Sequence, residues 1–208
     1  MLCSKIIRFA QQEENTTVLY YFCNYVLADS TDSNCGIILR SLAAQVLRNN
    51  PDLAPLIFDD YISQGLMPSI SQMRQIIPTL LSTFQSVRII IDGLDEYDDK
   101  DQKLILTEIT SLAVTKSLKH STAISKVLIS SRDVNQISRI LSRRPTVSLS
   151  DEQAAIGGAI QAFVRSKFSQ LVSSNLDDIS LEEDILKLIE QALVEKADGG
   201  FKFLWAIG

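Results

Sequence analysis

The sequence predicts an α/β protein built on a parallel sheet. Two short apolar runs, Ile89–Ile91 and Val127–Ile129, are each followed at once by polar residues, as strands buried on both faces are. Segments with helical spacing of apolar residues lie before, between and after these runs. Because strands and helices alternate along the chain, we expect parallel strands joined by helical crossovers.

The first part of the chain is predicted to hold one strand among several helices. Thr17–Cys23 is β-branched and aromatic, which is typical of a strand. Ser69 and Gln72 form a capping-box pattern that opens a helix, which Pro78 is expected to kink. Apolar spacing predicts helices around residues 2–10, 37–47, 53–63 and 69–84.

The second part continues the alternation and then becomes helical. Besides the two apolar runs, Thr146–Leu149 is expected to be a short strand. A capping-box pattern at Asp133 and Gln136 opens one of its helices. Helices are predicted over residues 104–113, 133–141, 150–171 and 180–196. We therefore expect an α/β domain over residues 1–149 and a helical subdomain over residues 150–208.

Composition excludes several classes of protein. The 208 residues, 46% hydrophobic and 22% charged, are typical of a soluble globular chain of one domain with at most a small appendage. A net charge of −5 argues against nucleic acid as a partner, because phosphate binding needs a basic surface. No apolar run approaches the ~20 residues that span a bilayer. Without a visible secretory signal, and with no membrane partner, a cytoplasmic location is expected.

Cysteine and histidine usage gives no sign of a metal site. Cys3, Cys23 and Cys35 are odd in number, widely spaced and without a C-x-x-C pair, as free thiols of a reducing compartment are. The single His120 has no Cys or His partners at the spacing of zinc ligands.

Charged side chains follow both predicted buried strands. Asp92, Asp95 and Glu96 follow the first, and Arg132 follows the second. The carboxyl ends of parallel strands share one edge of the sheet, where open α/β sheets bind ligands. In a phosphate-handling fold, Asp92 would hold Mg²⁺ through water, and Asp95 or Glu96 would orient the attacking water. Arg132 would stabilise γ-phosphate charge. The alternatives are an acidic surface turn and a surface Arg132 paired to Asp133.

Five segments together carry a family resemblance. In chain order they are Tyr20–Cys23, Ile38–Leu42, Ile89–Glu96, Val127–Asp133 and Ala197–Gly199. The set resembles the NACHT family of signal-transduction NTPases (STAND P-loop NTPases), in particular the fungal NOD-like-receptor type with nephrocystin-type N-terminal domains. In this resemblance Asp92 is the Walker B aspartate and Arg132 holds the sensor position. The family implies an ATPase switch that uses ATP and Mg²⁺, and whose ATP-bound form oligomerises and activates an effector. Homotypic or heterotypic NACHT–NACHT association is the partner that it implies.

The chain departs from this family at the phosphate-binding loop. A P-loop needs G-x-x-x-x-G-K-[ST], and the sequence contains no Gly-Lys pair. Leu2–Ile7 resembles the helix that follows the loop, so the strand before the loop is expected to be missing. In the family's sheet order that strand is central, between Val127–Ser130 and Thr146–Leu149. The expected fold is a P-loop NTPase-like parallel sheet that lacks its first, central strand, followed by a small helical subdomain. Unpaired backbone groups are expected along the gap.

Three functional hypotheses remain open. The first is a fragment of a NACHT-type ATP-dependent switch. It is expected to bind ATP weakly or not at all, and to be inactive as an ATPase. The second is a non-enzymatic interaction or decoy fragment, and the third is a non-functional gene remnant.

Near the end of the sequence, Gly200–Lys202 separates Asp198-Gly199 from Phe203–Trp205, whereas relatives continue directly into such an apolar run. The chain is expected to stop inside a helix.

Overall fold

The computed structural model describes residues 2–24, 33–58, 65, 67–113, 124–148, 166 and 203–207. The chain divides into two compact units, Met1–Val147 with Phe203–Gly208, and Ser148–Lys202. The helices predicted over residues 150–171 and 180–196 lie almost wholly outside the described residues, so the helical subdomain stays a prediction.

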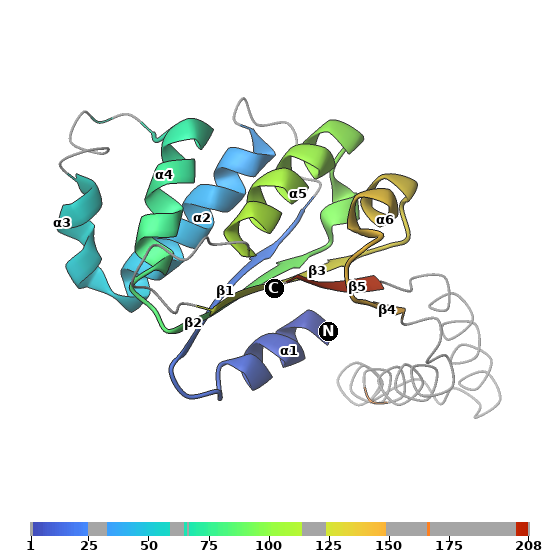
Figure 1. The fold of residues 1–208 in the computed structure, drawn as a ribbon, viewed down its shortest axis with the longest axis horizontal. Helices are drawn as coiled ribbons and strands as arrows, with labels where there is room; N and C mark the ends of the chain where they lie inside the picture. The colour runs from blue at the N-terminus through green and yellow to red at the C-terminus, as the bar shows by residue number, and fades with distance from the viewer. Residues whose placement is uncertain are drawn as a thin grey trace, which may run out of the picture. The chain divides into compact units, whose positions relative to one another are not determined.

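A sheet with the strand order β1-β2-β3-β5-β4 forms the centre of the first unit (Figure 1). Three strands, β1 (Thr16–Phe22), β2 (Ser86–Asp92) and β3 (Ile124–Ser131), pair in parallel. Two shorter strands, β4 (Thr146–Ser148) and β5 (Phe203–Ile207), complete the sheet, and β5 runs antiparallel to β3. The parallel strands and their covering helices confirm the predicted α/β fold class, which is consistent with a P-loop-like fold.

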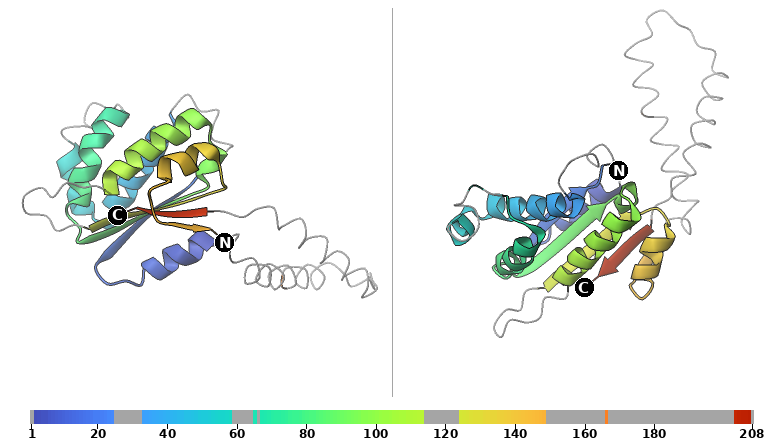
Figure 2. Two further views of the ribbon diagram at one scale, coloured as in Figure 1. Left: turned by 45° about the vertical axis from the view of Figure 1, so that its right-hand side comes forward. Right: turned by 90° about the horizontal axis from the view of Figure 1, so that it is seen from above.

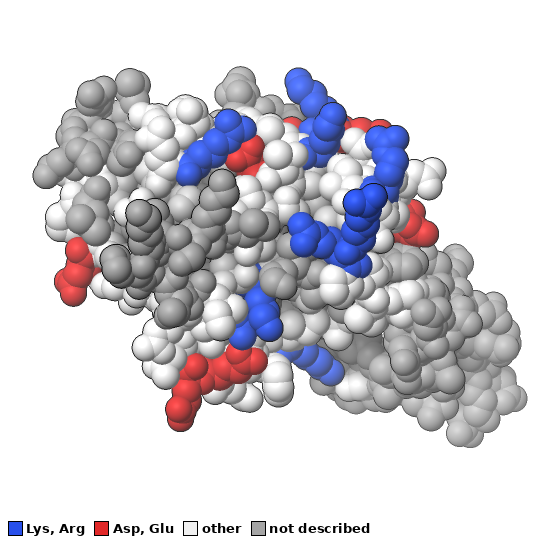
Figure 3. All heavy atoms as spheres, in the orientation of Figure 1, with Lys and Arg blue, Asp and Glu red and all other residues white. Residues whose placement is uncertain are grey.

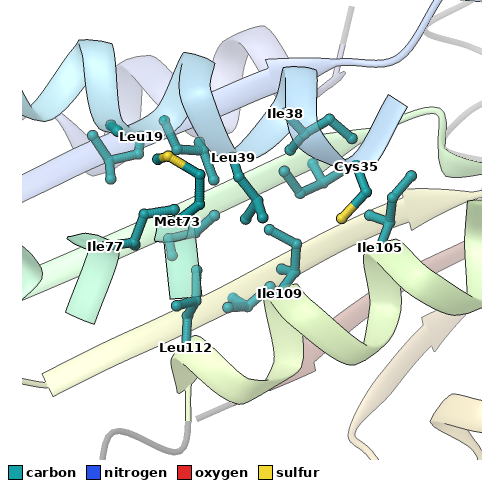
Figure 4. Packing of buried hydrophobic residues seen from close by; sticks show 14 of the residues in the cluster. Leu19, Cys35, Ile38, Leu39, Met73, Ile77, Ile105, Ile109 and Leu112 are labelled. Carbon is teal, nitrogen blue, oxygen red and sulfur yellow. The ribbon is translucent and has the colours of Figure 1, made fainter. Parts of the chain in front are cut away.

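Helices cover both faces of the parallel strands. On one face lie α2 (Asn34–Asn49), α4 (Ile70–Leu81) and α5 (Asp99–Ala113), whereas α1 (Leu2–Ala10) lies on the other (Figures 1 and 2). Side chains from β1, α2, α4 and α5 point toward one another in the main core (Figure 4). Successive strand residues face opposite ways, so Ile89 and Ile91 join this core while the buried Ile90 turns toward the face of α1. The prediction that this strand is buried on both faces is confirmed.

The helices before β2 agree with the sequence in place but not always in length. The capping box at Ser69 is confirmed, because Gln72 N donates to Ser69 Oγ at 3.3 Å and Ser69 N donates to Gln72 Oε1 at 2.8 Å. The helix predicted over residues 53–63 is a 3₁₀ turn, η2 (Pro51–Leu53), followed by the short α3 (Ala54–Ile57), and residues 59–64 lie outside the described part.

Two helix starts differ from the prediction for local reasons. Helix α5 begins at Asp99 rather than near residue 104, because the Asp98 carboxylate accepts the Asp101 N–H at 2.8 Å and caps the first turn. The capping box predicted at Asp133 is wrong. Its carboxylate accepts the Ser138 hydroxyl at 2.6 Å instead, and α6 (Asn135–Leu141) begins after Val134 without a side-chain cap.

The end of the chain differs most from the prediction. Phe203–Ile207 was expected to lie in a helix, and it forms the strand β5 instead. This strand lies between β3 and β4, the central position that was expected to be empty. An unpaired edge beside a core strand costs free energy, and an apolar pentapeptide at that edge supplies the missing backbone partners.

Candidate functional site

The carboxyl end of β2 leads directly into a tight acidic turn. Asp92 is the last residue of the strand, and Leu94–Glu96 forms the 3₁₀ turn η4. Between them Gly93 has a left-handed φ of 78°, which costs residues with a side chain roughly 1–2 kcal/mol. The Gly93 N–H donates to Ser130 O at 2.9 Å and ties the turn to β3. The chain thus reverses at Gly93 and returns Asp95 toward the end of β3.

Asp95 and Arg132 form a bidentate pair across the ends of β2 and β3. Arg132 Nε donates to Asp95 Oδ2 at 2.6 Å, and the Arg132 backbone N–H donates to Asp95 Oδ1 at 2.9 Å. Arg132 Nη2 also lies 3.8 Å from Glu96 Oε1. The side chain of Asp95 is 2% exposed, whereas that of Arg132 is 58% exposed. The anionic half of the pair is therefore inside and the cationic half faces solvent.

The pair determines the electrostatics of this edge. Burial alone would raise the pKa of Asp95, but the hydrogen bonds and charge of Arg132 outweigh it and lower this pKa below its usual value. Asp95 therefore stays ionised at neutral pH. The same contacts raise the pKa of Arg132.

A half-buried thiol lies at the same edge of the sheet. Cys23 follows β1, and its N–H donates to Asp92 O at 2.8 Å. Burial, and then the charges of Asp92 and Asp95, raise the pKa of Cys23 to about 12. The thiol is protonated at neutral pH and is not a ready nucleophile.

The four predicted site residues, Asp92, Asp95, Glu96 and Arg132, all lie at this edge of the sheet. Their placement follows the expectation for neighbouring parallel strands, while their chemical roles stay predictions. The carboxylate partners of Arg132 are Asp95 and Glu96 rather than Asp133, whose carboxylate accepts the Ser138 hydroxyl.

These residues fit only part of a magnesium–nucleotide site. In the described ranges, no three His, Cys, Asp or Glu side chains are grouped so that they could hold a metal ion. Asp92 could supply one carboxylate, which suffices for Mg²⁺ only when substrate phosphates and water provide the remaining ligands. The sequence has no Gly-Lys loop to anchor such phosphates. No chemical step through a nucleotide therefore follows from this arrangement.

A second polar feature, absent from the sequence predictions, lies among the helices. Glu108 is on the buried side of α5 with 5% of its side chain exposed, and Arg74 of α4 donates to it through Nε at 2.7 Å. Its signal in the sequence is a charged residue between Ile105 and Leu112 on the apolar face of the helix. The pair borders a pocket of 310 Å³, lined by Leu39, Met73, Arg74, Ile77, Thr107, Glu108, Ser111 and Leu112.

Charge is unevenly spread over the surface. On the face shown in Figure 3, basic side chains gather over the region of α5 and α6. These elements and the turn that follows carry Lys100, Lys103, Arg139, Arg143 and Arg144. A local basic area thus coexists with the net charge of −5.

One family matches the greater part of the chain. The sequence profile described as "Nephrocystin 3, N-terminal" matches residues 1–132. The match includes β1, β2 and β3 and ends at Arg132, so it covers all four strand-end residues. No curated protein and no solved structure matches the chain. None of the helices in the described residues has the length and apolar character needed to cross a bilayer.

Proposed function

The chain belongs to the nephrocystin 3, N-terminal family, and from this premise we propose that it is the partial nucleotide-binding core of a NACHT-type, ATP-dependent signalling switch. The observation that supports the proposal is the Asp95–Arg132 pair, which lies directly after Asp92 at the ends of two neighbouring parallel strands. Open α/β sheets bind ligands at this edge. The NACHT assignment, the fungal NOD-like-receptor type and a cytoplasmic location are parts of this proposal.

The geometry separates the roles of the two acidic residues after Asp92. Both carboxylate oxygens of Asp95 accept hydrogen bonds from Arg132, so Asp95 acts in this proposal as the residue that positions Arg132. Glu96 is 40% exposed and approaches Arg132 only at 3.8 Å. Glu96 is therefore the better candidate to orient a water molecule.

The proposal includes weak or absent ATP binding by this chain alone. The backbone N–H groups of a P-loop and its lysine hold most of the phosphate charge in such proteins, and this sequence has no Gly-Lys pair. ATP and Mg²⁺ are thus the expected cofactors of the intact family, and the proposal expects little or no ATP turnover by residues 1–208 alone.

A fusion that supplies the absent parts tests the proposal. A strand and P-loop from an intact relative are joined upstream of Leu2, and binding of a fluorescent ATP analogue is titrated with and without Mg²⁺. We expect Mg²⁺-dependent binding, which disappears when the lysine of the added loop is replaced by alanine. In the same fusion, Asp92→Asn should remove the dependence on Mg²⁺. A folded fusion that binds no nucleotide would refute the assignment.

A non-enzymatic interaction fragment is the second candidate, and the filled sheet favours it. Because β5 already occupies the position between β3 and β4, and Arg132 is already paired, neither is available without rearrangement. This candidate predicts co-purification with a tagged intact relative through NACHT–NACHT surfaces and no ATP turnover. Absence of any association would exclude it. A cooperative, reversible thermal transition of the chain would count against the remaining hypothesis, a non-functional remnant.

A further inference from the structure

The strand that completes the sheet comes from a distant part of the chain. β4 ends at Ser148 and β5 begins at Phe203, and the residues between them, Ser148–Lys202, form a compact unit of their own. Nevertheless β5 lies inside the sheet, between β3 and β4 (Figure 2). We call this space between β3 and β4 the central slot.

The central slot requires a strand. Val127–Ser131 of β3 pairs with Ile207–Phe203 of β5 in antiparallel register. Val127 and Ile129 are each 1% exposed, so the backbone beside them lies against the core. If β5 left, the N–H and C=O groups along this edge of β3 would lose their partners, which is costly beside a core and favours pairing with another strand.

The occupant need not come from the same chain. The register between β3 and β5 is defined by five residue pairs, and an identical segment from another copy can form all five. The entropy cost of closing a long connection changes only slowly with its length. Because β5 is joined to β4 through Ser148–Lys202, its advantage over the same strand from another copy is limited to an effective concentration on the order of mM.

We propose that the central slot is a strand-acceptor site, that Phe203–Ile207 is its exchangeable occupant, and that a second copy of this chain supplies the same segment in trans. The product is a strand-exchanged dimer whose population rises with protein concentration. This inference rests on the sheet pairing alone and does not depend on the nucleotide-binding proposal.

Disulfide trapping between two differently tagged chains tests the exchange directly. Leu128 and Ala206 are Cα partners in the register, so a Leu128→Cys chain is mixed with an Ala206→Cys chain at high concentration and oxidised. We expect a covalent heterodimer, with the cross-linked peptides identified by mass spectrometry so that the native cysteines do not confuse the result. The matched control is Leu128→Cys with Phe203→Cys, because Phe203 pairs with Ser131 and is out of register with Leu128.

The outcomes separate exchange from mere occupancy. A single chain with both Leu128→Cys and Ala206→Cys should close an intramolecular disulfide, which verifies that β5 is in the slot. That result without a heterodimer in the mixture would overturn the exchange, as would equal trapping of the matched and mismatched pairs. If the Leu128→Cys chain does not fold, Ser130 and Leu204 provide a second matched pair.

A peptide experiment measures the acceptor site itself. The probe is a dansyl-labelled peptide of residues 201–208, and the acceptors are the wild-type chain and the full chain with Ala206→Pro, which cannot complete the ladder with its own strand. We expect the variant to bind the peptide roughly 100-fold more tightly, because the intramolecular competitor is weakened. A scrambled peptide is the control. Failure of the variant to bind, or equal binding of the scrambled peptide, would overturn the proposal.

Discussion

The two halves of the sheet are held together in different ways. β1 and β2 are seven residues each, pair in parallel with a continuous register, and lie between helices on both faces. β5 has five residues from a remote segment and runs against β3, and β4 has three, with Val147 57% exposed. The parallel half is built from strand–helix units that are contiguous in sequence, whereas the other half depends on a segment that follows a separate unit in the sequence. We therefore expect the parallel half to carry most of the stability and the other half to be the place where the sheet can open.

The largest expected effect is in the parallel half. Ile89→Ala removes a fully buried side chain of β2 and should lower the free energy of unfolding by about 3 kcal/mol, through lost burial and the cavity left behind. The measurement is urea denaturation followed by circular dichroism. The matched control in the other half is Val147→Ala, which should stay within about 0.5 kcal/mol. Equal losses at the two sites would contradict the comparison.

A smaller effect is expected when the remote strand is broken. Ala206→Pro removes a backbone N–H from β5 and should lower the free energy of unfolding by about 2 kcal/mol. The parallel strands should stay folded in this variant. Because Trp205 lies in β5 and is the only tryptophan of the chain, its fluorescence reports on this strand separately from circular dichroism. Ala206→Val, which keeps the N–H, serves as the control. Global unfolding by Ala206→Pro would show that the halves do not open independently.

The Gly93 turn, which lies within the parallel half, is sensitive to backbone conformation. Gly93→Ala should destabilise the chain by roughly 1–2 kcal/mol, because φ is 78° there and only glycine adopts this value without strain. The matched control is Gly36→Ala in α2, where φ is not left-handed and an added Cβ lies 3.1 Å from Arg40 Nη1, which donates to Pro68 O, so any loss there reports crowding without backbone strain. Thermal unfolding of both variants distinguishes strain at the turn from a general effect of the added methyl group.

The smallest expected effect depends on pH. Asp95→Asn should lower the free energy of unfolding by about 1 kcal/mol at pH 7. The loss is small because its partner, Arg132, is exposed and screened by solvent. The folded-state pKa of Asp95 is lowered, so its contribution is present above the unfolded pKa of about 3.9 and is lost as pH falls through the lower folded value. The difference between wild type and variant should therefore shrink below about pH 4.

A double variant attributes this loss to the pair. Asp95→Asn combined with Arg132→Gln should cost less than the sum of the two single changes, because either change already breaks the interaction. A difference between wild type and Asp95→Asn that persists at pH 3, or strict additivity, would show that the loss has another cause.

Local patterns in the sequence predicted the elements that depend on near neighbours. β1, β2, β3 and α2 lie where β-branched runs and helical spacing placed them, and the Ser69 capping box formed because its two partners are three residues apart. The Asp133 pattern failed because Ser138, one turn further on, supplies a competing hydroxyl. Such competition between nearby side chains depends on rotamers that the sequence pattern does not reveal.

The candidate site was predicted in its place but not in its contacts. Parallel topology brings the ends of β2 and β3 to one edge, and this alone was enough to group Asp92, Asp95, Glu96 and Arg132. The double hydrogen bond from Arg132 to Asp95 depends on the reversal at Gly93, which brings Asp95 back to the end of β3. The Glu108–Arg74 pair was not predicted. A charged residue on an apolar helix face indicates that a buried partner exists, but the sequence does not identify that partner as Arg74.

The sequence by itself determined the α/β class, the parallel strands and the acidic strand end, because each follows from periodicity and residue type over a few positions. Only the tertiary structure decided the fate of Phe203–Ile207. Five apolar residues fit a helix or a strand equally well by periodicity, and their sequence says nothing of a vacant position far back along the chain. The unpaired edge of β3 decides between the two conformations, because it offers hydrogen-bond partners that only an extended segment can use.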